Sequence, residues 1–317
     1  MGSHAPGVTG GRGARPFARL RVVLCLLLCL GAAAARAADA PATAPAAASA
    51  EWHTFWSVQG RRNTVWLLGS VHLLQPQGSA PTPQVLRAYA ASKGLVMELD
   101  LAAVGPDALL GSNLALLTLP EGQTLRGVLG PDAWTKFLAA AKPLGIDPDF
   151  MSRFRPWFAA MTIEELHYMK LGYDPQSGVD QQFAKLAAAD GKPVTGLETV
   201  EEQLGFFASL DDREQRELLL QTIDDGGSAE AELAATVEAW RRGDTRALEA
   251  MLREARVKAP ALYRRLTSER NQRWMSRLLP LLDASENYLV IVGALHLVGE
   301  DGLVKLLERR GYRPVQH

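Results

Sequence analysis

Two histidines follow apolar segments at the same distance from a glycine. Gly69 precedes His72 by three positions at the end of VWLLGSVH, and Gly293 precedes His296 by three positions at the end of YLVIVGALH. Apolar runs of this kind predict strands that are buried on both faces. Open α/β sheets place ligands at the carboxyl ends of such strands, and a glycine there lets another group approach the backbone. We therefore interpret the histidines as candidates for one shared site, with simple strand capping by each histidine as the alternative.

A carboxylate ends a third apolar run. Glu98 lies in GLVMELD, where its burial costs several kcal/mol unless a cation pairs with it or a proton neutralises it. Two imidazoles and one carboxylate form a common open site for a divalent metal ion. Such an ion lowers the pKa of its bound water toward neutrality, which supplies hydroxide for hydrolysis. The residues therefore predict a metal site formed by His72, Glu98 and His296.

Further polar side chains could support this site. Asp180 begins a predicted helix, where it could cap the helix or orient a neighbouring group. Arg270 and Asn271 interrupt an otherwise amphipathic helix in SERNQRW. Arg270 could stabilise an oxyanion of the substrate. Alternatively, it could form a buried ion pair, and the candidate partners are Glu98, Asp180 and Glu198.

Several kinds of chemistry are absent from the sequence. It contains no phosphate-binding loop, no dinucleotide-binding fingerprint and no Gly-x-Ser-x-Gly elbow. Both cysteines, Cys25 and Cys29, lie in the apolar N-terminal segment, so a processed chain would have no thiol for a disulfide, a metal site or a nucleophile.

The N-terminal segment has the features of a signal peptide. Basic residues precede an apolar stretch at 22–35, and Ala35-Arg36-Ala37 fits a cleavage site. A permanent anchor is the weaker alternative, because the most apolar part has about ten residues against the roughly 20 that a spanning helix needs. We expect residues 1–37 to be removed, 38–49 to form a disordered linker, and the mature protein to be periplasmic or secreted, with no membrane span.

The charge of the mature chain argues against nucleic acid as a partner. The whole sequence has 34 Lys and Arg against 35 Asp and Glu. Residues 1–37 contain five arginines and no acids, so removing them leaves 29 basic residues against 35 acidic ones, a net charge of −6. No basic tract remains to bind phosphates.

Periodicity predicts an α/β fold with a central, mostly buried sheet, helices around it and a helical cap. Strands are expected at 51–57, 64–71, 95–99, 193–197 and 288–295. Helices are expected at 82–92, 131–141, 151–170, 179–189, 211–224, 230–242, 245–254, 258–282 and 300–310. We interpret residues 50–317 as a single domain, in which helical insertions at about 105–175 and 200–285 form the cap.

The order of the motifs resembles the TraB/GumN family, which also includes the Tiki membrane-linked metalloproteases. The motifs are LLGSVHLL, LVMELD, GVDQQFAKLAAADGKPVTGLET, ERNQRW and VIVGALHLVGEDGLVKLLERRGY, and they span about residues 52–312. The resemblance implies a fold shared with erythromycin esterase and ChaN-like haem-binding proteins. It also implies an active centre formed by His72, Glu98 and His296, and an ion such as manganese or cobalt; zinc is a third candidate.

The sequence therefore predicts an exported metal-dependent hydrolase that resembles a peptidase. Its substrate would be a peptide or another small polar molecule, and Glu98, Asp180, Arg270 and Asn271 are the expected catalytic and orienting residues. The alternative is a periplasmic protein without catalytic activity that binds haem or a small ligand on the same fold. The sequence gives no indication of the oligomeric state.

Overall fold

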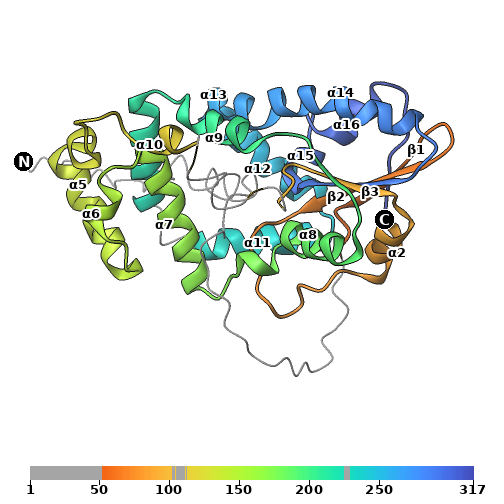
Figure 1. The fold of residues 1–317 in the computed structure, drawn as a ribbon, viewed down its shortest axis with the longest axis horizontal. Helices are drawn as coiled ribbons and strands as arrows, with labels where there is room; N and C mark the ends of the chain where they lie inside the picture. The colour runs from red at the N-terminus through yellow and green to blue at the C-terminus, as the bar shows by residue number, and fades with distance from the viewer. Residues whose placement is uncertain (1–51, 102–103, 105–110, 112, 225–228) are drawn as a thin grey trace, which may run out of the picture.

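A computed structural model describes residues 52–101, 104, 111, 113–224 and 229–317. The expected signal peptide and linker lie outside these residues. Within them, a six-stranded sheet forms the centre of the protein (Figure 1). Its strands are β1 (Phe55–Gln59), β2 (Thr64–Ser70), β3 (Gly94–Met97), β4 (Val194–Gly196), β5 (Tyr288–Gly293) and β6 (Val315–Gln316).

The strand order places the last long strand in the middle of the sheet. The order is β4-β3-β5-β2-β1-β6, so β5 lies between β3 and β2 and is parallel to both. Strand β4 is parallel to β3, whereas β1 is antiparallel to β2 and to β6. The register of β2 and β5 sets Ser70 opposite Gly293. Because their carboxyl ends coincide, the two Gly-x-x-His segments (residues 69–72 and 293–296) lie side by side.

Helices cover both faces of this sheet, as the apolar strand sequences require. All four residues of β3 and five of the six in β5 are buried. Helices α14 (Glu269–Asp283) and α16 (Leu303–Glu308) lie along one face, and α2 (Pro83–Ala91) and α8 (Val179–Asp190) lie along the other (Figure 1).

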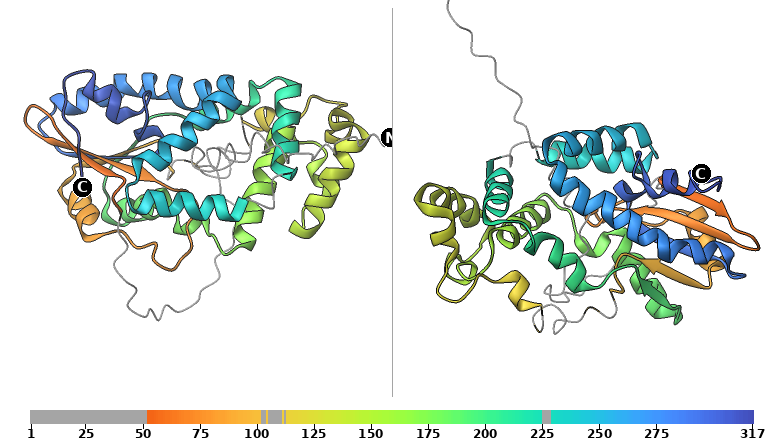
Figure 2. Two further views of the ribbon diagram at one scale, coloured as in Figure 1. Left: turned by 180° about the vertical axis from the view of Figure 1, so that it is seen from behind. Right: turned by 90° about the horizontal axis from the view of Figure 1, so that it is seen from above.

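A helical arm extends away from the sheet (Figures 1 and 2). Its helices are α5 (Leu125–Leu144), α6 (Pro148–Met151), α7 (Pro156–Lys170) and α10 (Asp212–Asp224). Helix α10 packs against α7 and α5, and the Trp157 ring of α7 stacks on Phe207 with ring centroids 5.4 Å apart. Dispersion and burial of aromatic surface therefore stabilise the arm.

The remaining helical segments among the described residues lie between these elements in the sequence. They are α4 (Leu114–Leu117), η1 (Pro175–Ser177), α9 (Val200–Ala208), α11 (Ala229–Arg241), α12 (Thr245–Lys258), α13 (Pro260–Tyr263), η2 (Arg264–Ser268) and α15 (Ala294–Leu297). Segment η2 is a π-helical turn directly before α14. None of the described helices has the length and apolar character needed to cross a membrane.

The α/β fold class predicted from the sequence is confirmed. All five predicted strands are present, although the first begins at Phe55 rather than 51. The predictions missed β6, α4, η1, α9 and α15. The helix predicted at 151–170 is interrupted between α6 and α7, and the one predicted at 258–282 is divided into α13, η2 and α14. The predicted strand at 288–295 was too long, because the chain turns into α15 after Gly293.

Candidate functional site

The first Gly-x-x-His segment leaves the sheet as a loop, and the second becomes a helix. His72 lies two residues beyond the end of β2, whereas His296 is the third residue of the single-turn helix α15. Neither histidine is therefore part of a strand. A Cβ atom on Gly69 would lie 2.5 Å from Thr54 Cγ2 and 3.0 Å from Ala294 Cα. The glycine thus gives clearance for packing of the chain itself, in particular for α15 against β2.

Glu98 is fully buried one residue beyond β3 and accepts two strong hydrogen bonds. Its Oε1 accepts from the backbone N–H of Gly293 at 2.7 Å, and its Oε2 accepts from Arg270 Nη2 at 2.6 Å. Burial raises the pKa of the Glu98 carboxyl, and the charges of Arg270 and His72 oppose that rise. The backbone N–H of Gly293, the N-cap of α15, therefore binds this carboxylate.

Arg270 joins two buried glutamates. Besides Glu98, it binds Glu198, with Nε at 3.0 Å from Oε1 and Nη2 at 2.7 Å from Oε2. Burial disfavours the guanidinium charge, but Glu98 and Glu198 outweigh it and raise the pKa of Arg270 above its ordinary value. Gln203 of α9 donates to both carboxylates at 3.3 Å. Of the two roles expected for Arg270, the structure shows the buried ion pair, with Glu98 and Glu198 as partners.

His296 is held on both sides of its ring. Its Nδ1 lies 2.7 Å from Asn271 Oδ1, and Arg270 Nη1 lies 3.1 Å from its Nε2. Because an amide oxygen and a guanidinium can only accept and donate respectively, the ring carries its proton on Nδ1. Asn271 is fixed in turn, since its Nδ2 donates to the carbonyls of His296 and Asp301 at 3.2 and 2.7 Å.

The surroundings of His296 keep its imidazole neutral. Burial, the charge of Arg270 and the charge of His72 all lower its pKa well below the ordinary value. The ring also packs on Trp274, with centroids 4.4 Å apart. Glu98 Oε1 lies 4.0 Å from His296 Nε2, with Arg270 hydrogen-bonded to both residues.

His72 has a carboxylate as its partner. Its Nδ1 lies 2.6 Å from Asp180 Oδ2, on the first turn of α8. Burial lowers the pKa of His72, but the charge and hydrogen bond of Asp180, together with the charge of Glu98, raise it above the ordinary value. Asp180 is not the N-cap of its helix: Gly178 takes that position, where a Cβ atom would lie 2.2 Å from the His72 carbonyl oxygen. Asp180 therefore orients His72.

The predicted metal ligands lie in one cluster, and Arg270 forms hydrogen bonds with two of them, Glu98 and His296. Both histidines have Nδ1 fixed by an oxygen acceptor, which is the usual arrangement of imidazoles that bind metal through Nε2. Among the described residues, the buried side-chain oxygens without a hydrogen-bond partner include Asp180 Oδ1 and Gln203 Oε1, whose side chains contact members of this cluster. Oriented imidazoles and a buried carboxylate are the ligand types that divalent metal ions bind. However, no three His, Cys, Asp or Glu side chains among the described residues converge as a metal ion requires, and Arg270 is hydrogen-bonded to both Glu98 and His296. The metal triplet stays a prediction.

Some members of the cluster were not expected from the sequence. Gln203, Trp274 and the backbone N–H of Gly293 were missed. Gln203 belongs to α9, whose start has a capping box between Thr199 and Glu202. The pattern Thr-x-x-Glu before an apolar run is a recognised sign of a helix start, so this element could have been predicted.

These observations define an α/β protein with a buried cluster of two histidines, two glutamates and an arginine at the carboxyl edge of its parallel strands. The chain belongs to the TraB/PrgY/gumN family, because the sequence pattern of that family matches residues 54–316. The family assignment made from the motifs is thereby confirmed.

Individual proteins show the same relationship. The chain is 26% identical over 242 residues to a protein of Escherichia coli strain K12 called "Uncharacterized protein YbaP", and the match covers 76% of this chain and 86% of that protein. The protein of the same name from Shigella flexneri matches to the same extent. No solved structure matches the chain.

Proposed function

We propose that this protein is an exported metal-dependent hydrolase that acts on peptides or other small polar substrates. The observation that carries the proposal is the matched fixing of His72 and His296, each through Nδ1 and each by a different helix. A capping role would not require a separate orienting side chain for each histidine. Orientation of this kind is typical of imidazoles that bind a metal or transfer a proton.

A divalent ion would be held by His72, Glu98 and His296. When bound, such an ion lowers the pKa of its water toward neutrality and polarises the substrate carbonyl. Asp180 and Asn271 would keep the two imidazoles turned toward it. Arg270 is hydrogen-bonded to Glu98 and His296, so we expect its charge to weaken metal binding, while its pairing with Glu98 opposes the effect of burial on the pKa of that carboxyl.

His72 is the member of the cluster that can meet a substrate. Its side chain is 9% exposed, against 0% for His296 and 1% for Arg270. With its Nδ1 fixed by Asp180, His72 would hold the ion at the side of the cluster that water and substrate can reach. Arg270 is buried against two carboxylates, and we therefore assign it a positioning role toward Glu98 rather than contact with the substrate.

Metal analysis of the purified full chain tests the proposal directly. We expect about one manganese, cobalt or zinc ion per chain, measured by elemental analysis after dialysis. His72→Ala and His296→Ala should each reduce the bound metal at least about tenfold. His167→Ala, on α7 of the helical arm, is the matched control and should keep the metal. Unchanged metal content in both site variants would refute the metal site.

A cleavage assay tests the activity. A peptide library incubated with the full chain and added divalent ions should show cleavage that chelation abolishes. His72→Ala should remove the cleavage while circular dichroism shows a folded protein. Cleavage that persists in a folded His72→Ala variant would contradict the role of His72.

The binding of haem is the alternative function, and the burial of His296 argues against it. The ring is fully buried between Trp274, Asn271 and Arg270, so an axial ligand position at His296 would require all three to move. A Soret band that appears on adding haem and disappears in His296→Ala would support the alternative.

Export is a separate part of the proposal. It rests on the basic and apolar N-terminal segment that ends at Ala35-Arg36-Ala37. N-terminal sequencing of the protein recovered from the periplasmic fraction should begin at Ala38. Recovery of the uncleaved chain from the cytoplasm would contradict it.

A further inference from the structure

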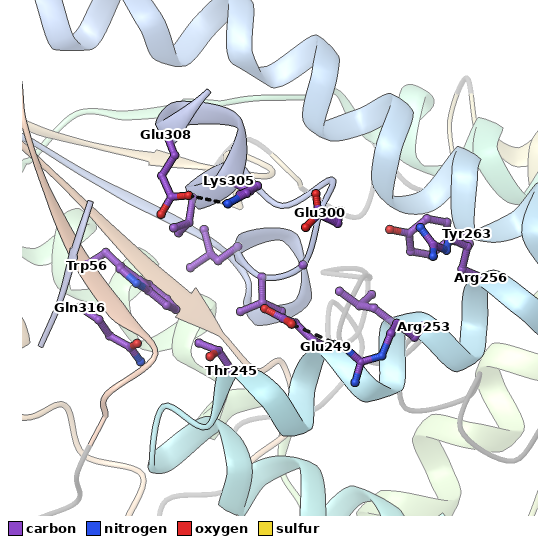
Figure 3. A pocket seen from close by; sticks show the side chains of 15 residues that line it. Trp56, Thr245, Glu249, Arg253, Arg256, Tyr263, Glu300, Lys305, Glu308 and Gln316 are labelled. Carbon is purple, nitrogen blue, oxygen red and sulfur yellow. Dashed lines mark hydrogen bonds and ion pairs between the residues drawn. The ribbon is translucent and has the colours of Figure 1, made fainter. Parts of the chain in front are cut away.

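A cavity lies beside the candidate site and has no role in the chemistry proposed above. It has a volume of about 370 Å³ and lies between β1, β6, α12 and the segment that follows His296 (Figure 3). Residues Leu297 to Gly299 line it, directly after the histidine. Pockets of a few hundred cubic ångströms are of the size that binds small molecules.

The charges around the cavity leave one cation unmatched. Lys305 pairs with Glu308 at 3.0 Å, and Arg253 pairs with Glu249 at 3.8 Å, as the dashed lines in Figure 3 show. The third lining carboxylate, Glu300, pairs with an arginine outside the cavity at 2.6 Å.

Arg256 is the cation that remains. Within the part of the chain that the structure describes, it is the lining cation without a carboxylate partner. It lies near Tyr263 in Figure 3. Burial and the adjacent Asp301 raise the pKa of Tyr263 to about 12, and the charge of Arg256 opposes this rise, which supports their proximity. The Tyr263 hydroxyl is protonated and donates to Asp301 at 3.0 Å, so it supplies no negative charge to Arg256.

Apolar side chains form the other part of the wall. Trp56 of β1 has its indole ring at the cavity, as Figure 3 shows, and the aliphatic side chains of Leu252, Leu297 and Val298 also line it. All four residues are buried. A flat apolar group in the cavity would cover the small apolar surface that these side chains leave accessible, which favours binding.

We propose that this cavity binds a small organic carboxylate with a flat apolar body. The guanidinium of Arg256 forms the charge-assisted hydrogen bonds to the carboxylate, and Trp56 and the aliphatic side chains contact the body of the ligand. The ligand would be a monoanion, because every other lining charge already has a partner of opposite sign. This site is independent of the proposed hydrolase activity.

Calorimetry with a matched pair of probes tests the proposal. Naphthoate and naphthamide have nearly the same shape, and only the first carries a charge. The full chain should bind naphthoate about tenfold to a hundredfold more tightly than naphthamide, because a hydrogen bond to a charged group is the stronger one. Equal affinities, or no binding of naphthoate up to about 10 mM, would overturn the proposal.

Two arginine variants on the same helix locate the binding. Arg256→Gln should abolish the preference for naphthoate. Arg246→Gln, an exposed arginine of α12 that does not line the cavity, should retain it. Trp56→Phe keeps an aromatic ring and should weaken both probes by a similar factor. A preference that survives in Arg256→Gln would refute the assignment. Because Arg256 is not part of the metal cluster, metal content should not change in this variant.

Discussion

The two Gly-x-x-His segments have the same spacing and opposite electrostatic surroundings. His72 has a carboxylate partner, Asp180, and a raised pKa, whereas His296 has an amide partner, Asn271, and a pKa lowered well below the ordinary value. His72 also reaches solvent, while His296 is enclosed and receives a hydrogen bond from Arg270.

This difference separates what the motif determines from what the partner determines. Each histidine lies three residues after a glycine near the end of its strand. Because Ser70 of β2 lies opposite Gly293 of β5, both histidines leave the sheet at the same edge. The protonation state depends on side chains from two other helices, α8 and α14. One motif can thus provide an imidazole with a raised pKa near the surface and a neutral imidazole inside.

The largest effect is expected from removing the cation on the His296 side. Arg270→Met leaves Glu98 and Glu198 buried without their partner, which should lower the free energy of unfolding by about 3–5 kcal/mol. Urea denaturation at neutral pH measures it. Arg273→Met is the control, because Arg273 pairs with the same Glu198 at 3.5 Å but is 48% exposed and should contribute less than about 1 kcal/mol. Equal losses in the two variants would show that Arg270 does not stabilise the buried carboxylates.

A second variant makes the two segments alike. Asn271→Asp gives His296 a carboxylate partner, so its pKa should rise, which an NMR titration of the imidazole can follow. The variant also loses the Nδ2 donors to the carbonyls of His296 and Asp301, and its free energy of unfolding should fall by about 2–3 kcal/mol. An unchanged titration of His296 would mean that burial and Arg270 alone determine its protonation state.

The glycine of the first segment should matter through packing. Gly69→Ala places a Cβ atom against Thr54 and Ala294 and should cost about 1–2 kcal/mol in the free energy of unfolding. Gly205→Ala in α9 is the control, because no heavy atom lies within 4 Å of the new Cβ atom. Chemical denaturation of both variants checks this, and a neutral Gly69→Ala would contradict a close approach of α15 to β2.

The smallest expected effect is a dependence on pH on the His72 side. Because the folded pKa of His72 is raised, its contribution to stability is fully present below about pH 6.5 and is lost as the pH rises through the folded pKa. Asp180→Asn removes the hydrogen bond and the charge that raise this pKa, so the loss of stability should be greater at pH 6 than at pH 8. A cost that is the same at both pH values would exclude Asp180 as the cause of the raised pKa.

The strand ends could be predicted from the sequence, but few of the side-chain partners around them could. Long apolar runs are strong local signals, and parallel strands share one carboxyl edge, so His72 and Glu98 could be placed near each other. Arg270 had three possible carboxylate partners in the sequence. Its choice of Glu98 and Glu198 depends on how α14 packs on the sheet, which no local pattern encodes. The cavity around Arg256 was also not foreseen, since Trp56 and Leu297 meet there from distant parts of the chain.

The central position of β5 has a consequence for how the protein is made. Strands β2 and β3 follow each other closely in the sequence, yet they are not neighbours in the sheet, because β5 lies between them. A growing chain therefore carries two incomplete pieces of sheet, each with an apolar open edge, until residues 288–293 have been synthesised. Pairings between such distant segments form slowly and leave edges exposed to aggregation. The carboxylate of Glu98 can accept its hydrogen bond from the Gly293 N–H only after β5 has joined the sheet, so the site is completed late in folding.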